Sequence, residues 1–289
     1  MAKNSIKTWF SIFAELSKIK IPFAVSFSAF TGYVLFKGSL DAGLLISTVG
    51  VFLLASGSAA LNQFQEYRFD TKMQRTQSRP IPSGRFSSTN TLIFSVIFSL
   101  IGFLILLYGA NITAGFIGLL TLLWYNGIYT PLKRKTVFAV LAGAFVGAFP
   151  PLIGWSAARG NIFDKEILLI AALMFIWQVP HFILLLLKYG KEYEVAGFSV
   201  LTTYLSEKQL RKVIFVWILA TASSVVIIPF AGIISSMVII IILLVSSLWL
   251  VLTFYFLLRR QQMNLKMAFI QINLFLIFVL ALFTVDSLL

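Results

Sequence analysis

The sequence contains no cysteine, a single histidine and only ten acidic residues among its 289 positions. The lack of cysteine excludes disulfides, thiol nucleophiles and thiolate metal sites. Charged residues make up 11% of the chain, whereas a soluble domain of this size carries about a quarter. Hydrophobic residues make up 59% and the mean hydropathy is +0.95. The composition therefore predicts a protein embedded in a membrane, without a visible water-soluble domain.

Long apolar runs recur along the whole chain, and each approaches the roughly 20 residues that a helix needs to cross a bilayer. The runs are continuous, which argues against the alternating pattern of a membrane barrel. We predict an all-α integral membrane protein of one domain, 1–289, with about nine spans. Eight or ten spans are the alternatives, because only the short stretches GANITA and AGIISS separate two neighbouring pairs. The predicted spans are 21–37, 41–64, 90–109, 112–130, 136–157, 166–187, 212–231, 234–257 and 267–288.

The basic residues are distributed very unevenly between the two sides that nine spans define. The side of the N-terminus holds 20 of the 23 Lys and Arg, and the other side holds only Lys37, Arg159 and Lys165. Positive charge marks the cytoplasmic side, so the N-terminus is predicted to be cytoplasmic and the C-terminus to lie across the membrane. Topology thus explains the net charge of +13 without nucleic acid as a partner.

The first 20 residues form a short amphipathic segment. One helical face would carry Ile6, Trp9, Phe10, Phe13 and Leu16. The apolar core is too short and interrupted for a cleavable signal. We predict an interfacial helix on the cytoplasmic leaflet.

The second span is followed by acids whose order topology does not explain. Asn62, Glu66 and Asp70 are spaced i, i+4, i+8 and share one helical face. Stacked carboxylates repel one another unless a cation lies between them, and an oxygen-only ligand set favours Mg²⁺. The following basic residues can bind phosphate oxygens, and Pro80 and Pro82 are predicted to end the helix. The alternative is a salt-bridged helix end.

Two further stretches carry polar groups near the same side. Lys133, Arg134 and Lys135 close the fourth span, and Gln178 and His181 lie in the sixth, on a helix predicted to be interrupted by Pro180. A polar residue within a span is costly and tends to line a cavity, so His181 is either functional or a hydrogen-bonded structural residue. Glu192 and Glu194 then follow the sixth span much as the first acids follow the second, which predicts a duplicated four-helix unit with a ninth helix added.

Four motifs together resemble the UbiA superfamily of intramembrane prenyltransferases, over roughly residues 20–285. They are NQFQEYRFDTKMQRTQSRPIPSGR, YNGIYTPLKRKT, GAFPPLIGW and WQVPHF followed by KEYEVAGFSVL. PPLIGW and WQVPHF are most similar to the branch of protohaem IX farnesyltransferases. The resemblance implies a helical bundle around a cavity open at the cytoplasmic leaflet. It also implies Mg²⁺-dependent transfer of a farnesyl group from farnesyl diphosphate to a vinyl group of haem B, giving haem O.

The resemblance places Asn62, Glu66 and Asp70 in the first metal–diphosphate motif and Glu192 in the second. The family usually has Asp at both Glu positions, so each side chain here is one methylene longer. With the chemistry above, the predicted site comprises catalytic Asn62, Glu66 and Asp70; diphosphate-binding Arg75, Arg79, Lys133 and Arg134; the metal ligands Glu66, Asp70 and Glu192; and the haem contacts Gln178, His181 and Tyr193. The expected partners are farnesyl diphosphate, haem B, the lipid bilayer of a prokaryotic cytoplasmic membrane, and a downstream haem A synthase or oxidase.

Two other functions fit parts of the sequence. One is a UbiA-type enzyme that prenylates an aromatic or quinone precursor, against which WQVPHF argues. The other is a secondary transporter, which predicts charges or broken helices near the membrane centre. The acids lie at the cytoplasmic ends instead, which favours chemistry on an anionic head group.

Overall fold

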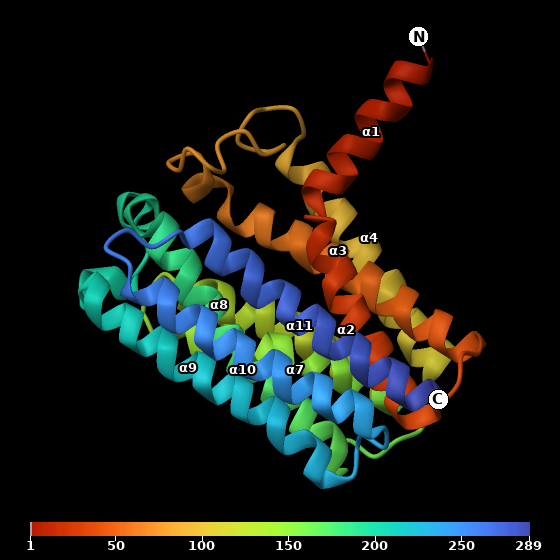
Figure 1. Ribbon diagram of the computed structural model, residues 1–289. Helices are drawn as coiled ribbons and strands as arrows, with labels where there is room; N and C mark the ends of the chain where they lie inside the picture. Colours follow the sequence, from red (N-terminus) through yellow and green to blue (C-terminus); the bar gives the residue numbers. More distant parts are fainter. Residues whose placement is uncertain (1) are drawn as a thin grey trace.

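The computed structural model describes the backbone of residues 2–289 and the side chains of residues 9–289, and in that part of the chain it contains helices and no strand (Figure 1). The α-helices are α1 (Ala2–Leu16), α2 (Lys20–Lys37), α3 (Ala42–Asp70), α4 (Ser88–Leu104), α5 (Ile112–Leu123), α6 (Thr130–Leu132), α7 (Ala139–Ala157), α8 (Lys165–Ala196), α9 (Glu207–Ile227), α10 (Met237–Arg259) and α11 (Leu265–Leu288). Two π-helical turns, η1 (Ile105–Ala110) and η2 (Trp124–Tyr129), extend α4 and join α5 to α6. Short 3₁₀ turns, η3 (Leu201–Thr203) and η4 (Ile228–Ala231), flank α9.

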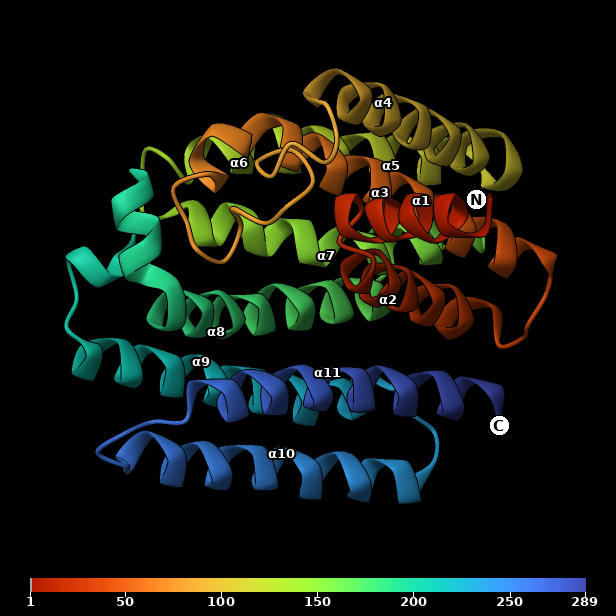
Figure 2. The same ribbon diagram turned by 90° about the horizontal axis from the view of Figure 1, so that it is seen from above.

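The long helices run side by side as a bundle (Figure 2). In the described part of the chain, eight helices are long and apolar enough to span a membrane by themselves. A ninth span results when α2 is counted together with the end of α1, from which it is bent by 61°. The prediction of an all-α membrane protein with about nine spans is therefore confirmed.

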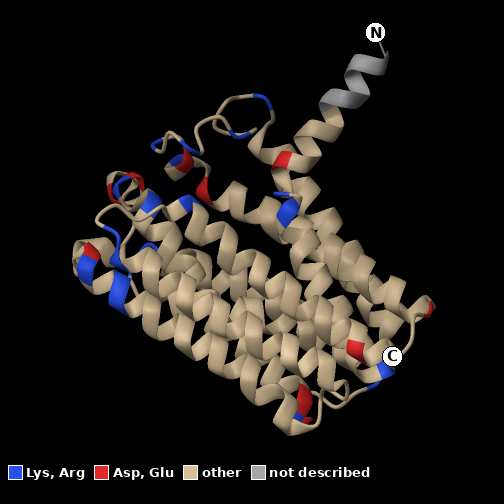
Figure 3. Ribbon diagram, viewed as in Figure 1, with Lys and Arg blue, Asp and Glu red and all other residues tan. Residues whose placement is uncertain are grey.

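Charged residues gather at one end of the bundle, around the loop after α3 and the ends of α8 and α10 (Figure 3). The opposite end carries few, as the sequence predicts. Because positive charge marks the cytoplasmic side, this end is the one expected to face the cytoplasm. α1 is a helix as expected, with Trp9 and Phe10 exposed and Phe13 packed on Phe94 and Phe98 of α4. The predicted contribution of Ile6 lies outside the described side chains.

Two expectations about helix ends are wrong. α3 ends at Asp70, not at Pro80, because residues 71–87 fold into turns in which the Thr76 hydroxyl donates to the Asp70 carbonyl at 3.0 Å. This bond satisfies one of the carbonyls left free at a helix C-terminus. Pro180 does not interrupt α8, which continues from Lys165 to Ala196. Both helices therefore extend beyond the predicted spans and carry their acids on helical turns.

Small residues bring α2 and α7 into backbone contact. A Cβ atom at Gly154 would overlap the Ala29 carbonyl oxygen, and one at Gly32 would overlap the Pro151 carbonyl oxygen. Close approach through small residues is the usual way that membrane helices gain packing energy. The contact fixes α2, and with it the turn between α1 and α2, against the rest of the bundle.

We expect Gly154→Ala to destabilise the protein by about 1–3 kcal/mol, since α2 and α7 must separate to admit a methyl group. Gly127→Ala is the matched control, because a Cβ at that position meets nothing within 4 Å. Thermal unfolding in detergent measures the difference. Equal melting temperatures for the two variants would contradict the proposed contact.

The nine-span topology places the two chain ends on opposite sides. A C-terminal alkaline phosphatase fusion, which needs an oxidising compartment for its disulfides, should be active in cells, and a C-terminal fluorescent protein fusion should be dark. The reverse pattern would show an even number of spans.

Candidate functional site

The last two turns of α3 carry three polar side chains on one face, as their spacing predicts. Asn62, Glu66 and Asp70 are 1%, 4% and 1% exposed. A buried carboxylate is strongly destabilising unless a cation or hydrogen-bond donor compensates its charge. The surroundings of the two acids therefore decide what this end of the helix can do.

Each buried acid has its own cation, supplied by a different segment. Lys133 follows α6 directly. Its Nζ lies 2.7 Å from Glu66 Oε1 and donates to Oε2 at 2.8 Å. Arg79 Nη1, in the loop after α3, donates to the Asp70 oxygens at 2.8 and 2.7 Å. The side chains of both cations are about one-fifth exposed. Two predicted phosphate-binding residues thus meet two predicted metal ligands directly.

Lys18 is a third cation at this site, and the sequence reasoning missed it. Its Nζ donates to Asn62 Oδ1 at 2.9 Å, and Asn62 Nδ2 donates to Thr130 Oγ1 at 3.2 Å. Burial and the positive charges of Arg79 and Lys133 disfavour the charged form of Lys18, whereas the carboxylates of Glu66 and Asp70 favour it. The sequence gives no signal for this contact, because 44 residues separate Lys18 from Asn62. From the sequence alone, Lys18 is one of many basic residues that set the membrane topology.

The turn that carries Lys18 is fastened to α3 and to the loop beyond it. Gln63 Nε2 donates to the carbonyl oxygens of Glu15 and Leu16 at 2.7 and 2.9 Å. Arg85 donates to both carboxylate oxygens of Glu15, at 3.0 and 2.5 Å. The hydrogen bond from Arg85 lowers the pKa of the Glu15 carboxyl. Gln63 and Arg85 together hold the end of α1 beside the buried acids.

The π-helical turn η2 aligns α6 with α3. Asn126, which is buried in this turn, accepts from Ser58 Oγ at 2.6 Å and donates to Gln65 Oε1 at 3.2 Å. Gln65 Nε2 returns a hydrogen bond to the Asn126 carbonyl at 3.0 Å. Extra residues in π turns often occur at functional sites. Here the turn fixes Thr130 and Lys133 opposite the acidic face.

The remaining predicted residues of the polar end lie at its margin. Arg134 donates to the Gln65 carbonyl at 2.7 Å and stacks over the Phe69 ring at 4.5 Å, so it covers the flank of α3. Glu192 accepts from the backbone N–H of Arg75 at 3.0 Å, and the Arg75 guanidinium donates to the Tyr193 hydroxyl at 2.9 Å. These contacts join the loop after α3 to the end of α8. Within the described residues, no three metal-binding side chains form a cluster.

His181 lies among aromatic rings inside the bundle. Its ring centroid is 4.9 Å from Trp177 and 4.8 Å from Phe269 of α11, and its buried Nδ1 has no hydrogen-bond partner among the described residues. Phe182 stacks on Tyr129, over which the Lys133 ammonium lies at 5.4 Å. Aromatic faces therefore connect the acid–cation pairs to the histidine. Gln178 points at Gly147 of α7, where a Cβ would lie 2.7 Å from its Oε1.

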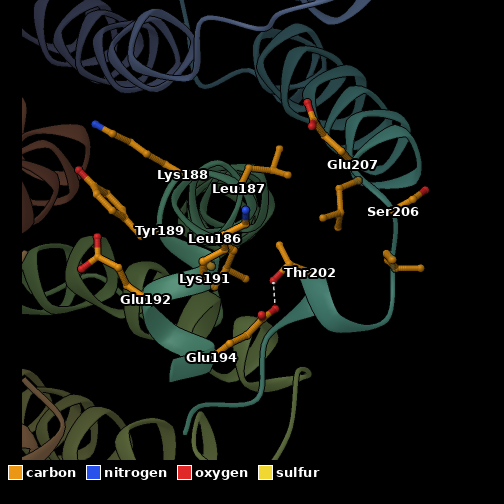
Figure 4. Close-up of a pocket in the computed structure, with 13 residues that line it drawn as sticks. Leu186, Leu187, Lys188, Tyr189, Lys191, Glu192, Glu194, Thr202, Ser206 and Glu207 are labelled. Carbon is orange, nitrogen blue, oxygen red and sulfur yellow. Dashed lines mark hydrogen bonds between the residues drawn. The ribbon is translucent and has the colours of Figure 1, made fainter. Parts of the chain in front are cut away.

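A cavity of about 610 Å³ lies between the end of α8, the turn η3 and the start of α9 (Figure 4). Glu194 borders it and accepts from Thr202 at 2.9 Å and from Thr203 at 3.2 Å. Of the predicted site residues only Glu192 lines this cavity. Glu194 is thus engaged in a local contact away from the paired acids of α3.

Comparison with known proteins agrees with these features. The UbiA prenyltransferase family matches residues 25–279. A relative named protoheme IX farnesyltransferase from Solibacter usitatus is 38% identical over 200 residues, which cover 65% of this chain and 68% of that protein. One of the same name from Geobacter sulfurreducens is 36% identical over 208 residues, covering 72% and 77%.

A solved structure has the same fold. It is a UbiA homologue from Archaeoglobus fulgidus bound to DMAPP and Mg²⁺, with a TM-score of 0.71 at 10% identity, covering 96% of this chain and 98% of that one. The resemblance seen in the motifs, to the superfamily and to its protohaem IX farnesyltransferases, is confirmed. The chain belongs to the UbiA prenyltransferase family.

Proposed function

We propose that this protein transfers a farnesyl group from farnesyl diphosphate to a vinyl group of haem B and so produces haem O. The observation that carries the proposal is the pair of buried ion pairs, Glu66 with Lys133 and Asp70 with Arg79, at the cytoplasmic end of an apolar bundle. Relatives named protoheme IX farnesyltransferase support the acceptor. A fold relative bound to DMAPP and Mg²⁺ supports the donor class.

The residues present fit a magnesium ion. Glu66 Oε1 is buried and accepts no hydrogen bond, although the Lys133 ammonium is 2.7 Å away outside hydrogen-bond geometry. Carboxylate oxygens without sulfur or nitrogen partners suit this hard cation. Glu66 and Asp70 would hold it, and Glu192 would join from α8 only after leaving the Arg75 backbone N–H that it accepts from in this structure. When bound, Mg²⁺ neutralises charge on the leaving diphosphate.

The two ion pairs already contain both halves of a site for a metal diphosphate. On binding, Lys133 Nζ and Arg79 would exchange their carboxylate partners for phosphate oxygens. Each charged group then keeps a partner of opposite sign throughout, which avoids the penalty of about 3–5 kcal/mol for an unpaired buried charge. Arg75, on the same loop as Arg79, would approach the diphosphate from the side of α8.

The reaction needs a path from the polar end into the bundle. As the C–O bond of farnesyl diphosphate breaks, its electron pair leaves with the diphosphate, and the aromatic faces of Tyr129 and Phe182 stabilise the allylic cation. The vinyl π electrons form the new C–C bond. Water adds to the resulting cation and loses a proton. His181, whose Nδ1 is unpartnered, would face the haem, and Gln178 and Tyr193 would contact its edge.

The product would pass to a haem A synthase or an oxidase in the cytoplasmic membrane of a prokaryote. The second candidate is prenylation of an aromatic or quinone precursor, because other members of the superfamily share the diphosphate end. The aromatic surroundings of His181 favour haem.

Purified protein incubated with haem B, farnesyl diphosphate and Mg²⁺ should yield haem O, detected by mass spectrometry. Chelation of divalent ions should abolish turnover, and added Mg²⁺ should restore it. Absence of haem O together with prenylation of 4-hydroxybenzoate would transfer the assignment to the quinone branch.

Asp70→Ala should reduce turnover by at least about a hundredfold, because it removes a metal ligand and leaves Arg79 without its partner. Glu194→Gln is the matched control at the same end of the bundle and should retain activity, since the Glu194 carboxylate accepts, among the described residues, only from Thr202 and Thr203. Near-normal turnover of a folded Asp70→Ala protein would show that the metal assignment is wrong.

His181→Ala should raise KM for haem B about tenfold or more, while KM for farnesyl diphosphate changes little, because the side chain is separated from the acids by Tyr129 and Phe182. Steady-state kinetics with each substrate varied in turn measures the two constants. An equal rise in KM for both substrates would indicate that His181 has a structural role.

A further inference from the structure

Lys18 has no carboxylate partner among the described residues, whereas Lys133 and Arg79 are each paired with an acid of α3. Its Nζ donates to a neutral amide, Asn62 Oδ1, and no carboxylate of the described residues lies within 4.0 Å of it. Arg79 and Lys133 are close enough for their charges to act on it. We infer that Lys18 is a further diphosphate-binding residue, which approaches the leaving group from the turn between α1 and α2. The inference rests on the proposed function.

The charge balance of the site points to an anion. Three cations, Lys18, Arg79 and Lys133, surround two carboxylates, Glu66 and Asp70, which leaves one positive charge in partly buried surroundings. One bound Mg²⁺ would raise the excess to three, equal to the charge of about −3 on fully ionised farnesyl diphosphate. In its charged form Lys18 supplies one of these positive charges, and a bound anion would in turn favour that charged form.

The backbone around Lys18 is built to keep the side chain in place. Lys18 has a φ of +49°, a left-handed conformation that is uncommon for residues other than glycine. Such strained residues persist only where the surrounding structure holds them, and they cluster at ligand sites. Gln63 holds this turn through the two carbonyls that precede Lys18, those of Glu15 and Leu16. A lysine that only set the membrane topology would need neither a strained backbone nor the hydrogen bonds from Gln63 that hold its turn.

The contacts of Lys18 also distinguish it from Lys20, the next lysine in the sequence. Lys20, two residues later, begins α2 and is exposed. Both lysines contribute equally to topology, but only Lys18 contacts the polar face of α3. Lys20 is therefore the matched control for charge, residue type and place in the chain.

The test measures binding of inorganic diphosphate, in the presence of Mg²⁺, to the full-length protein in detergent by calorimetry. A charge-assisted hydrogen bond contributes about 1.5–3 kcal/mol, so K18Q should weaken binding about 10- to 100-fold. K18R should restore part of the affinity, and K20Q should stay within about twofold of the unchanged protein. In turnover, K18Q should raise KM for farnesyl diphosphate and leave KM for haem B unchanged.

Binding by K18Q within twofold of the unchanged protein would overturn the inference, as would an equal loss in K20Q. A thermal unfolding profile of K18Q like that of K20Q shows that the loss is not one of folding. If the unchanged protein binds no diphosphate, the inference and the proposed function fail together. If it binds diphosphate but forms no haem O, only the proposed acceptor fails.

Discussion

Two carboxylates at the end of α3 are buried, and the surrounding structure depends on compensating their charge. Lys133 and Arg79 meet Glu66 and Asp70 at hydrogen-bond distance. Each cation comes from a different loop, so the ion pairs fasten the segments after α3 and α6 to one helical face. A purely structural helix end would gain as much from apolar residues, since buried ion pairs contribute little net stability over hydrophobic packing. Two such pairs side by side are better explained by a ligand that carries both signs of charge.

The bundle serves this site by holding its parts from several directions. The contact between α2 and α7 through Gly32 and Gly154 fixes the turn that presents Lys18. The π-helical turn at Asn126 sets Thr130 and Lys133 opposite α3. Tyr129 and Phe182 lead from the ion pairs to His181, beside which the proposed acceptor would bind. Polar chemistry at the membrane surface is thereby joined to an apolar interior suited to an isoprenoid chain.

Much of this arrangement could be predicted from the sequence. Apolar runs of fixed length predict spans because the bilayer has a fixed thickness, and the i, i+4, i+8 spacing predicts that Asn62, Glu66 and Asp70 share a face. The sequence could not predict which cation pairs with which acid, because the positions of Lys133 and Arg79 depend on the conformation of the loops that carry them. The contact of Lys18 with Asn62 was missed for the same reason, as was the contact of Arg134 with the Gln65 carbonyl on the flank of α3. The end of α3 at Asp70 depends on the turns in residues 71–87. The prolines could not predict this end, because Pro80, the first of them, lies ten residues after Asp70.

In the proposed function, the two internal ion pairs exchange partners when a metal diphosphate binds. An experimental structure with Mg²⁺ and a non-hydrolysable farnesyl diphosphate analogue would show this exchange. We expect Mg²⁺ on oxygens of Glu66 and Asp70, with Lys133 Nζ and Arg79 Nη1 on phosphate oxygens. A structure in which the analogue binds elsewhere, while Glu66–Lys133 and Asp70–Arg79 remain at their present distances of 2.7 Å, would contradict it.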